Sequence, residues 1–75
     1  MKKYKNLSGN SGVAAYEVAK DSVTIGFTTS AVYIYSNQSA GSGNIRQMKS
    51  LALAGKGLST FIDKNVKERF ARKIR

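Results

Sequence analysis

The chain has 75 residues, no cysteine and no histidine, and its 13 Lys and Arg against four Asp and Glu give a formal net charge of +9. A chain of this length forms one domain with a small core, and the lack of cysteine excludes disulfides and cysteine-based zinc sites. The positive charge favours a polyanionic partner, with nucleic acid the first candidate and an anionic membrane surface the second.

The first residues are expected to lie outside the folded domain. Residues 1–11, in which Lys2, Lys3 and Lys5 precede a Gly- and Asn-rich turn, predict a flexible basic tail with little to bury. The domain is then residues 12–75. We expect no membrane span, because no apolar run approaches the required length of about 20 residues. We expect no signal peptide, because no apolar segment follows the basic start at Lys2 and Lys3. The absence of cysteine fits a cytoplasmic location.

Three segments have the composition of β-strands, namely residues 13–18, 23–28 and 31–36. In the middle segment Val23, Ile25 and Phe27 alternate with small or polar residues, so one face should pack on a core and the other should face water. In the first segment the residues that could share a face are Ala14, Tyr16 and Val18. Short links between the segments predict an antiparallel meander with residues 23–28 in the middle.

Two helices are predicted after the strands. Ser42 is a suitable N-cap for a helix over residues 43–54, and Gly55 is suited to end it. A second helix begins near Leu58 and is expected to continue to about residue 68. Its apolar spacing degrades after Val66, so the helix either extends past the edge of the sheet or ends near residue 68 with the tail turning away. The expected core-facing residues are Ile45, Met48, Leu51 and Ala52 in the first helix, and Leu58, Phe61, Ile62, Val66 and Phe70 in the second.

The predicted fold is therefore α+β, with a three-stranded antiparallel β-meander followed by two C-terminal α-helices packed on one face. Phe27 on the central strand and Phe61 on the last helix should both be buried.

Composition argues against catalysis. Histidine and cysteine are absent, which removes the commonest general bases and the catalytic triads that depend on either residue. The four carboxylates, Glu17, Asp21, Asp63 and Glu68, are not spaced to lie side by side on one element. We therefore expect no enzyme, catalytic residue, cofactor, metal site or small-molecule substrate.

The segment Gly55–Lys56–Gly57 has some likeness to a phosphate-binding loop. A P-loop needs a further glycine four residues earlier and a strand leading into it, whereas here a helix leads in. A link that breaks the helix is the better interpretation, although Lys56 beside the second helix could still contact a phosphate.

Tyr33 and Tyr35 could stack on unpaired bases, as aromatics on an open sheet do in several RNA-binding modules, or belong to the core. The register of the hairpin distinguishes the two. A two-residue loop at residues 29–30 turns the tyrosines outward, and a three-residue loop turns them inward. Because Thr-Ser is poor chemistry for a two-residue turn, we favour inward tyrosines.

Basic residues concentrate toward the C-terminus, where only Glu68 interrupts them after residue 64. A solvated helix face is the ordinary explanation for such a run, but one-sided charge also suits phosphate contact. The candidate nucleic-acid-binding residues are Lys49, Lys56, Lys64, Lys67, Arg69, Arg72 and Lys73, together with Tyr33 and Tyr35.

Several short motifs occur in order along the chain: a Tyr-x-Tyr pair, a Lys-Gly pair, an aromatic residue and an aliphatic-basic pair. They are Tyr33 and Tyr35, Lys56 and Gly57, Phe61, and Val66 and Lys67. Over residues 11–74 this order resembles the KTSC family, a small domain named after the C-terminus of some lysyl-tRNA synthetases and also found as stand-alone bacterial proteins. The usual Tyr- and Pro-containing tail of that family is missing here. The resemblance carries with it a suggestion of RNA binding.

The function expected from the sequence is that of a small basic KTSC-like module that binds nucleic acid, RNA rather than duplex DNA. Backbone phosphates would provide most contacts, with little sequence specificity. The alternative is an accessory domain for protein interaction, which docks on an acidic protein partner through apolar residues at a frayed C-terminus, Phe70 and Ile74.

Overall fold

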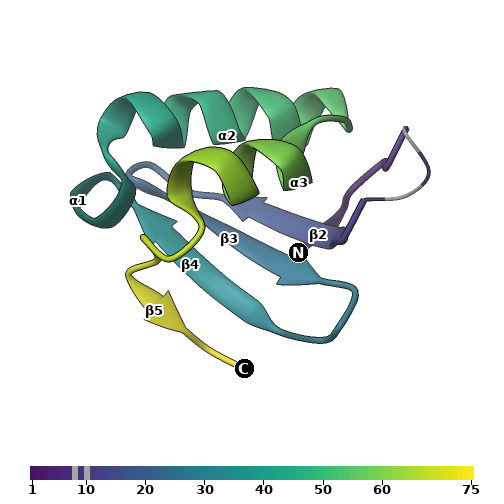
Figure 1. Cartoon of the computed structure of the whole chain (residues 1–75), viewed down its shortest axis with the longest axis horizontal. Helices are drawn as coiled ribbons and strands as arrows, with labels where there is room; N and C mark the ends of the chain where they lie inside the picture. The colour runs from purple at the N-terminus through teal and green to yellow at the C-terminus, as the bar shows by residue number, and fades with distance from the viewer. Residues whose placement is uncertain (8, 10) are drawn as a thin grey trace.

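A computed structural model describes residues 1–7, 9 and 11–75. The fold is α+β, with a five-stranded antiparallel sheet covered on one face by helices (Figure 1). In sheet order the strands are β1 (Lys2–Lys3), β2 (Val13–Val18), β3 (Ser22–Phe27), β4 (Val32–Ser36) and β5 (Arg72–Lys73). The helical elements are α1 (Asn37–Ala40), α2 (Ser42–Ala54), α3 (Leu58–Phe61) and the π-helical turn η1 (Ile62–Val66). Within the described residues, no helix has the length and apolar character needed to cross a membrane.

The predicted meander is the centre of this sheet. The strands β2, β3 and β4 lie within one residue of the expected segments, and β3 is the middle strand. Val23 and Ile25 on β3 are fully buried, as the alternation predicted. The prediction of three strands was incomplete, because β1 pairs with β2 at one edge and β5 pairs with β4 at the other.

The strand β2 contains a bulge that changes its predicted face. Val13 lies opposite Phe27, but Ala15 lies opposite the very next residue, Gly26, so Ala14 is the extra residue. A bulge of this kind resets the alternation of side chains. Val13 and Tyr16 are therefore the buried residues of β2. Tyr16 and Val18 share a face as predicted, and only the placement of Ala14 on that face was wrong.

The hairpin between β3 and β4 has a three-residue loop. Phe27 N–H donates to the Ala31 carbonyl oxygen at 2.8 Å, and Ser30 N–H donates to the Phe27 carbonyl oxygen at 3.0 Å. Ser30 has a φ of 75°, the left-handed conformation that closes such a loop. This register places Tyr33 opposite Ile25, so Tyr33 and Tyr35 lie on the helix-covered face, as we favoured.

The N-terminal segment differs from the expected tail with little to bury. Tyr4 has only 2% of its surface exposed, and its hydroxyl accepts a hydrogen bond from Leu58 N–H at 3.3 Å. Leu7 N–H donates to the Gly55 carbonyl oxygen at 2.8 Å. A Cβ added to Gly55 would lie 2.6 Å from Lys5 Cβ, and the φ of Gly55 is 81°, so only glycine fits there. Residue 5 thus closes over the link between α2 and α3.

Serine capping occurs one helix earlier than expected. The Ser36 hydroxyl accepts from Ser39 N–H at 3.1 Å, and Ser39 Oγ accepts from Ser36 N–H at 3.0 Å, forming a capping box. This box starts α1 where a loop was predicted. Helix α2 then begins at Ser42 with Gly41 at its N-cap position, so the predicted Ser42 cap was wrong.

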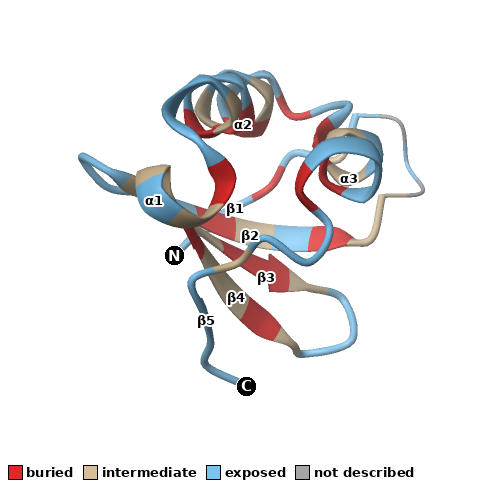
Figure 2. Cartoon of the chain, turned by 60° about the vertical axis from the view of Figure 1, so that its left-hand side comes forward, coloured by how far each residue is buried: buried red, intermediate tan, exposed pale blue. Residues whose placement is uncertain are grey.

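The core lies between the sheet and the helices, where the buried segments of both layers face each other (Figure 2). From the helices it receives Ala40, Ile45, Met48, Ala52, Leu58, Ile62 and Val66. Phe61 is only partly buried because it lies one residue, about 100°, off the line of Leu58, Ile62 and Val66. Phe27 is also partly buried at the margin, so the prediction that both phenylalanines are buried was wrong.

The last helix ends at Val66, close to the end near residue 68 in the second predicted alternative. The predicted turning away of the tail was wrong, because the chain returns to the sheet. The π-helical turn η1 stops at Val66, and the segment after it joins β4. Ala71 N–H donates to the Ile34 carbonyl oxygen and Ile74 N–H to the Val32 carbonyl oxygen, each at 2.7 Å. Strand β5 therefore covers the edge of β4 beside the tyrosines.

Candidate functional site

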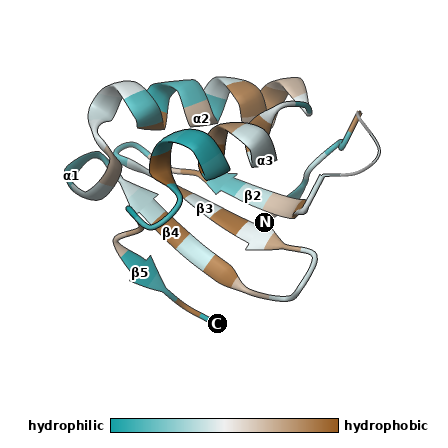
Figure 3. Cartoon of the chain, in the orientation of Figure 1, coloured by the Kyte–Doolittle hydropathy of each residue, from teal (hydrophilic) through white to brown (hydrophobic). Residues whose placement is uncertain are grey.

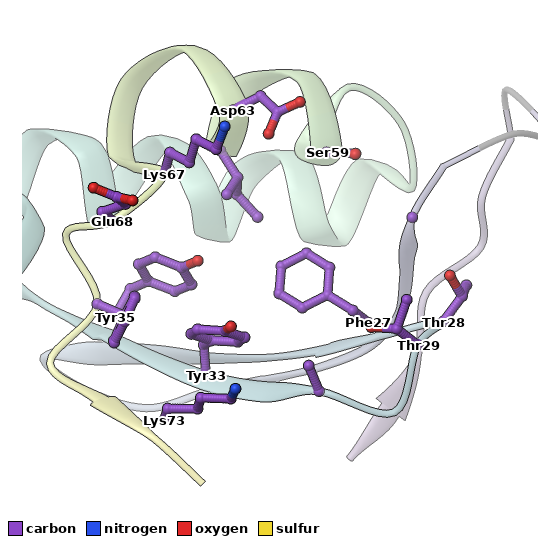
Figure 4. A pocket seen from close by; sticks show the side chains of 14 residues that line it. Phe27, Thr28, Thr29, Tyr33, Tyr35, Ser59, Asp63, Lys67, Glu68 and Lys73 are labelled. Carbon is purple, nitrogen blue, oxygen red and sulfur yellow. The ribbon is translucent and has the colours of Figure 1, made fainter. Parts of the chain in front are cut away.

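An open groove of about 580 Å³ separates the β3–β4 hairpin from α3 and η1 (Figure 4). Volumes of this order are typical of sites that hold a small molecule or part of a larger ligand. Aromatic side chains dominate the sheet side of this groove, and polar side chains of η1 and its C-terminal end stand on the opposite side. We refer to it as the aromatic groove. The aromatic residues that line it are Phe27, Tyr33, Tyr35 and Phe70.

Tyr33 is at the centre of the aromatic residues. Its ring lies edge-to-face with Phe27 at a centroid distance of 5.7 Å and with Phe70 at 4.7 Å, and it is stacked near-parallel to Tyr35 at 6.4 Å. Edge-to-face and offset geometries are the favourable ones for aromatic rings. Tyr33 remains only partly buried, so this supported ring still presents surface to the groove.

Tyr35 forms the deep part of the aromatic groove. Only 1% of its surface is exposed, yet its hydroxyl points along the groove (Figure 4). Among the described residues this hydroxyl makes no hydrogen bond. Burial, with smaller contributions from Tyr33 and the charge of Asp63, raises the pKa of Tyr35 to about 12. The phenol therefore stays protonated at neutral pH and can donate to a ligand.

Two lysines stand at the rim of the groove. Lys67 follows η1 on the helix side, and Lys73 belongs to β5 on the sheet side (Figure 4). The Lys73 ammonium lies 5.7 Å from the centroid of the Tyr33 ring, within the range of a cation–π interaction. In Figure 3, the last helical turn and β5 have hydrophilic colours, whereas β4 between them carries hydrophobic segments.

Two carboxylates also line the aromatic groove, Asp63 on η1 and Glu68 just after it. In the described part of the chain the only ion pair joins the N-terminus to Glu17 at 3.9 Å. Neither groove carboxylate therefore forms an ion pair within 4.0 Å with a lysine or arginine of this part, although Lys67 stands on the same side of the groove as Asp63 (Figure 4). Asp63 is near enough to Tyr35 for its charge to contribute to the raised pKa of that phenol.

Of the nine residues predicted from the sequence, the groove brings together four: Tyr33, Tyr35, Lys67 and Lys73. Arg72 lies opposite Ile34, which places it on the face of the sheet away from the helices. Lys49 is engaged elsewhere, since its ammonium donates to the Lys20 carbonyl oxygen at 2.8 Å. The other three are exposed but do not line the groove: Lys56 between α2 and α3, Lys64 on η1, and Arg69 before β5.

Sequence reasoning missed Phe27, Phe70 and Asp63 as groove residues. Phe27 was assigned to the core, and Phe70 either to the core-facing side of the second helix or to a frayed end, whereas both pack against Tyr33. The one available signal was parity, because inward tyrosines on β4 must face the same layer as Phe27 on β3. Helical spacing placed Phe70 toward the core, but nothing local indicated that it would contact Tyr33 from a segment that follows the helix.

The described residues contain no group of three or more His, Cys, Asp or Glu side chains that could hold a metal ion. Comparisons of the chain with protein-family models, with curated proteins and with solved structures give no match. The case for a function therefore depends on the geometry and charge of the aromatic groove.

Proposed function

We propose that this protein binds single-stranded nucleic acid, RNA in preference to duplex DNA, at the aromatic groove. Lys67 and Lys73 contact phosphates on either side of the groove, and an unpaired base stacks against Tyr33. The observation that carries the proposal is the combination of two rim lysines with a supported, partly exposed tyrosine ring in a chain of net charge +9. Neither feature alone would distinguish a binding site from a basic surface.

Single strands suit this geometry better than duplexes. A duplex keeps its bases paired and stacked on one another, whereas an unpaired base offers a π-face that aromatic side chains bind with about 1–3 kcal/mol each. Phosphate contacts contribute affinity that is independent of sequence and falls with salt. The Tyr-x-Tyr and Lys-Gly motifs support a KTSC-like assignment, and we propose it on that basis.

The test is a titration of a short labelled oligouridine at about 50 mM and about 200 mM salt, a range over which phosphate-dependent affinity falls steeply. A Lys67→Gln/Lys73→Gln variant is compared with a Lys20→Gln/Arg46→Gln control, which removes the same charge away from the groove. The groove variant should flatten the plot of log K against log salt by about 1.4, which is about 0.7 for each lost contact. The control should keep the slope of the wild-type protein.

Two results would contradict the proposal. Equal effects of the two double variants would mean that net charge, and not the groove, attracts the oligonucleotide. A wild-type protein that binds neither RNA nor DNA at low salt, where surface electrostatics are strongest, would exclude the function altogether.

Protein interaction is the second candidate, and a second hollow favours it. This hollow, of about 440 Å³, is lined by Met1, Tyr16, Val18 and Leu53 among others. Leu53 is 58% exposed and Val18 43% exposed, which is unusual for apolar residues that sit together. Phe70, which the sequence suggested as a docking residue at a frayed C-terminus, packs on Tyr33 and Tyr35 instead and does not support this candidate. Binding to a protein at the hollow would show a shallow salt dependence.

A further inference from the structure

We propose that the aromatic groove recognises one base of the bound strand and prefers guanine, with Asp63 as the residue that distinguishes it. This inference rests on the proposed function and deepens it, since phosphate contacts and stacking carry no sequence information by themselves. The proposed contact would recognise one base of a nucleic-acid strand whose other contacts are electrostatic.

The position of Asp63 is the first observation. It lies on η1, on the side of the groove that faces the aromatic residues of the sheet (Figure 4). A base stacked beside Tyr33 would present its edge toward this side. π-helical turns are rare and occur often at functional sites, and this one sets the Asp63 carboxylate at the groove.

The chemistry of the groove is the second observation. Asp63 has no ion-pair partner among the described residues, so its oxygens are available as acceptors. The Tyr35 side chain is 99% covered, and its hydroxyl points into the same groove without a partner there. The site thus offers a carboxylate on the helix side of the groove that can only accept and, on the sheet side, a phenol that can donate.

Guanine matches this pair better than the other bases. Its Watson–Crick edge carries two adjacent N–H donors followed by a carbonyl oxygen. A carboxylate can accept from both donors, and the phenol can donate to the carbonyl. Uracil offers one N–H between two carbonyl oxygens that the carboxylate would repel. Adenine and cytosine each place a ring nitrogen acceptor next to their amino group. Unpaired bases in proteins are commonly identified in this way, by stacking together with hydrogen bonds to that edge.

The experiment measures the affinity of short oligouridines whose central base is U, G, A or C, by fluorescence anisotropy at about 50 mM and about 200 mM salt. The wild-type protein should bind the G-containing strand about tenfold more tightly than all-U, which is the scale of one bidentate base contact. Asp63→Asn should abolish this preference. It should also bind all-U slightly more tightly, because a negative charge facing a polyanion has been removed.

Asp21→Asn is the matched control, since it removes the same charge at the β2–β3 turn, outside the groove. It should keep the preference for G. Thermal melts of both variants confirm that they are folded, as expected for exposed positions.

The outcomes separate this inference from the proposed function. If all four oligonucleotides bind with equal affinity and a steep salt dependence, the function holds and the guanine preference is wrong. A preference for G that survives in Asp63→Asn would also refute the role of Asp63. Absence of binding by every oligonucleotide at low salt refutes the function and the inference together.

Discussion

The ring of Phe70 stands edge-on against the ring of Tyr33, with centroids 4.7 Å apart and planes at 73°. Tyr33 belongs to β4, and Phe70 belongs to the segment that connects η1 with β5. This contact therefore joins the C-terminal segment to the sheet at the aromatic groove. The Tyr33 ring also contacts Phe27 on β3 and Tyr35 on β4. Residues from three parts of the chain therefore support this one ring.

The first prediction concerns this contact. Phe70→Ala should lower the free energy of unfolding by about 1–3 kcal/mol, because it removes a partly buried aromatic pair but not a core residue. It should also weaken oligonucleotide binding, since Tyr33 loses its support. Ile74→Ala is the control: this side chain is 52% exposed and should change stability by no more than about 0.5 kcal/mol. Urea melts that show the two variants to be equally stable would contradict the role given to Phe70.

The second prediction concerns the N-terminal segment. Tyr4→Phe keeps the buried ring but leaves Leu58 N–H without its acceptor. A buried donor left unpaired costs about 1–3 kcal/mol, so the urea midpoint should fall clearly. Leu7→Ala, at a side chain that is 64% exposed, should have almost no effect. If Tyr4→Phe is as stable as the wild-type protein, the hydrogen bond from Leu58 N–H to Tyr4 does not contribute to stability.

The third prediction concerns pH. The pKa of Tyr35 is raised from 10.0 to about 12 in the folded protein, first by burial and then by Tyr33 and Asp63. Above pH 10 the unfolded chain releases a proton that the folded chain retains. Stability from this group is therefore fully present below pH 10 and is lost as the pH rises to about 12, by up to about 1.4 kcal/mol per pH unit.

Tyr35→Phe isolates this contribution. The variant cannot ionise at position 35, so its free energy of unfolding should fall less steeply than that of the wild-type protein between these pH values. At neutral pH the two should differ little, because the hydroxyl makes no hydrogen bond among the described residues and is not a fully buried atom left unpaired. Parallel losses of stability in the two proteins would show that Tyr35 ionises as readily in the folded state as in the unfolded state.

The fourth prediction concerns the hairpin. Ser30 holds a φ of 75°, which costs a non-glycine residue roughly 1 kcal/mol. Ser30→Gly should raise the free energy of unfolding by about 0.5–1 kcal/mol, since glycine adopts this conformation without strain. Thr29→Gly at the preceding loop position, where φ is not positive, should destabilise instead. A destabilising Ser30→Gly would mean that the loop closes differently.

The elements that the sequence predicted well are those set by neighbours along the chain. The alternation of Val23 and Ile25 gave β3, and the poor chemistry of Thr-Ser in a two-residue turn gave the inward tyrosines. Leu58, Ile62 and Val66 form one helical stripe, which placed the last helix over the sheet.

The elements that were missed depend on partners far away in the chain. A two-residue strand has no alternation of its own, so β1 and β5 exist only through the strands beside them. Tyr4 is buried in the core cluster, and its hydroxyl accepts from the N–H of Leu58, 54 residues later. The aromatic groove needs Phe70 to return beside Tyr33, and the backbone hydrogen bonds of β4 with the C-terminal segment bring it there. None of these pairings has a local signature.

The binding site is located most directly by a map of the amide chemical-shift changes that occur when the protein is titrated with a short single-stranded RNA. The changes should concentrate around the aromatic groove, at Phe27, Tyr33, Asp63, Lys67 and Lys73, and should saturate together. Changes confined to the sheet face that carries Arg72, or to the hollow around Leu53, would place the binding surface elsewhere and contradict the central claim.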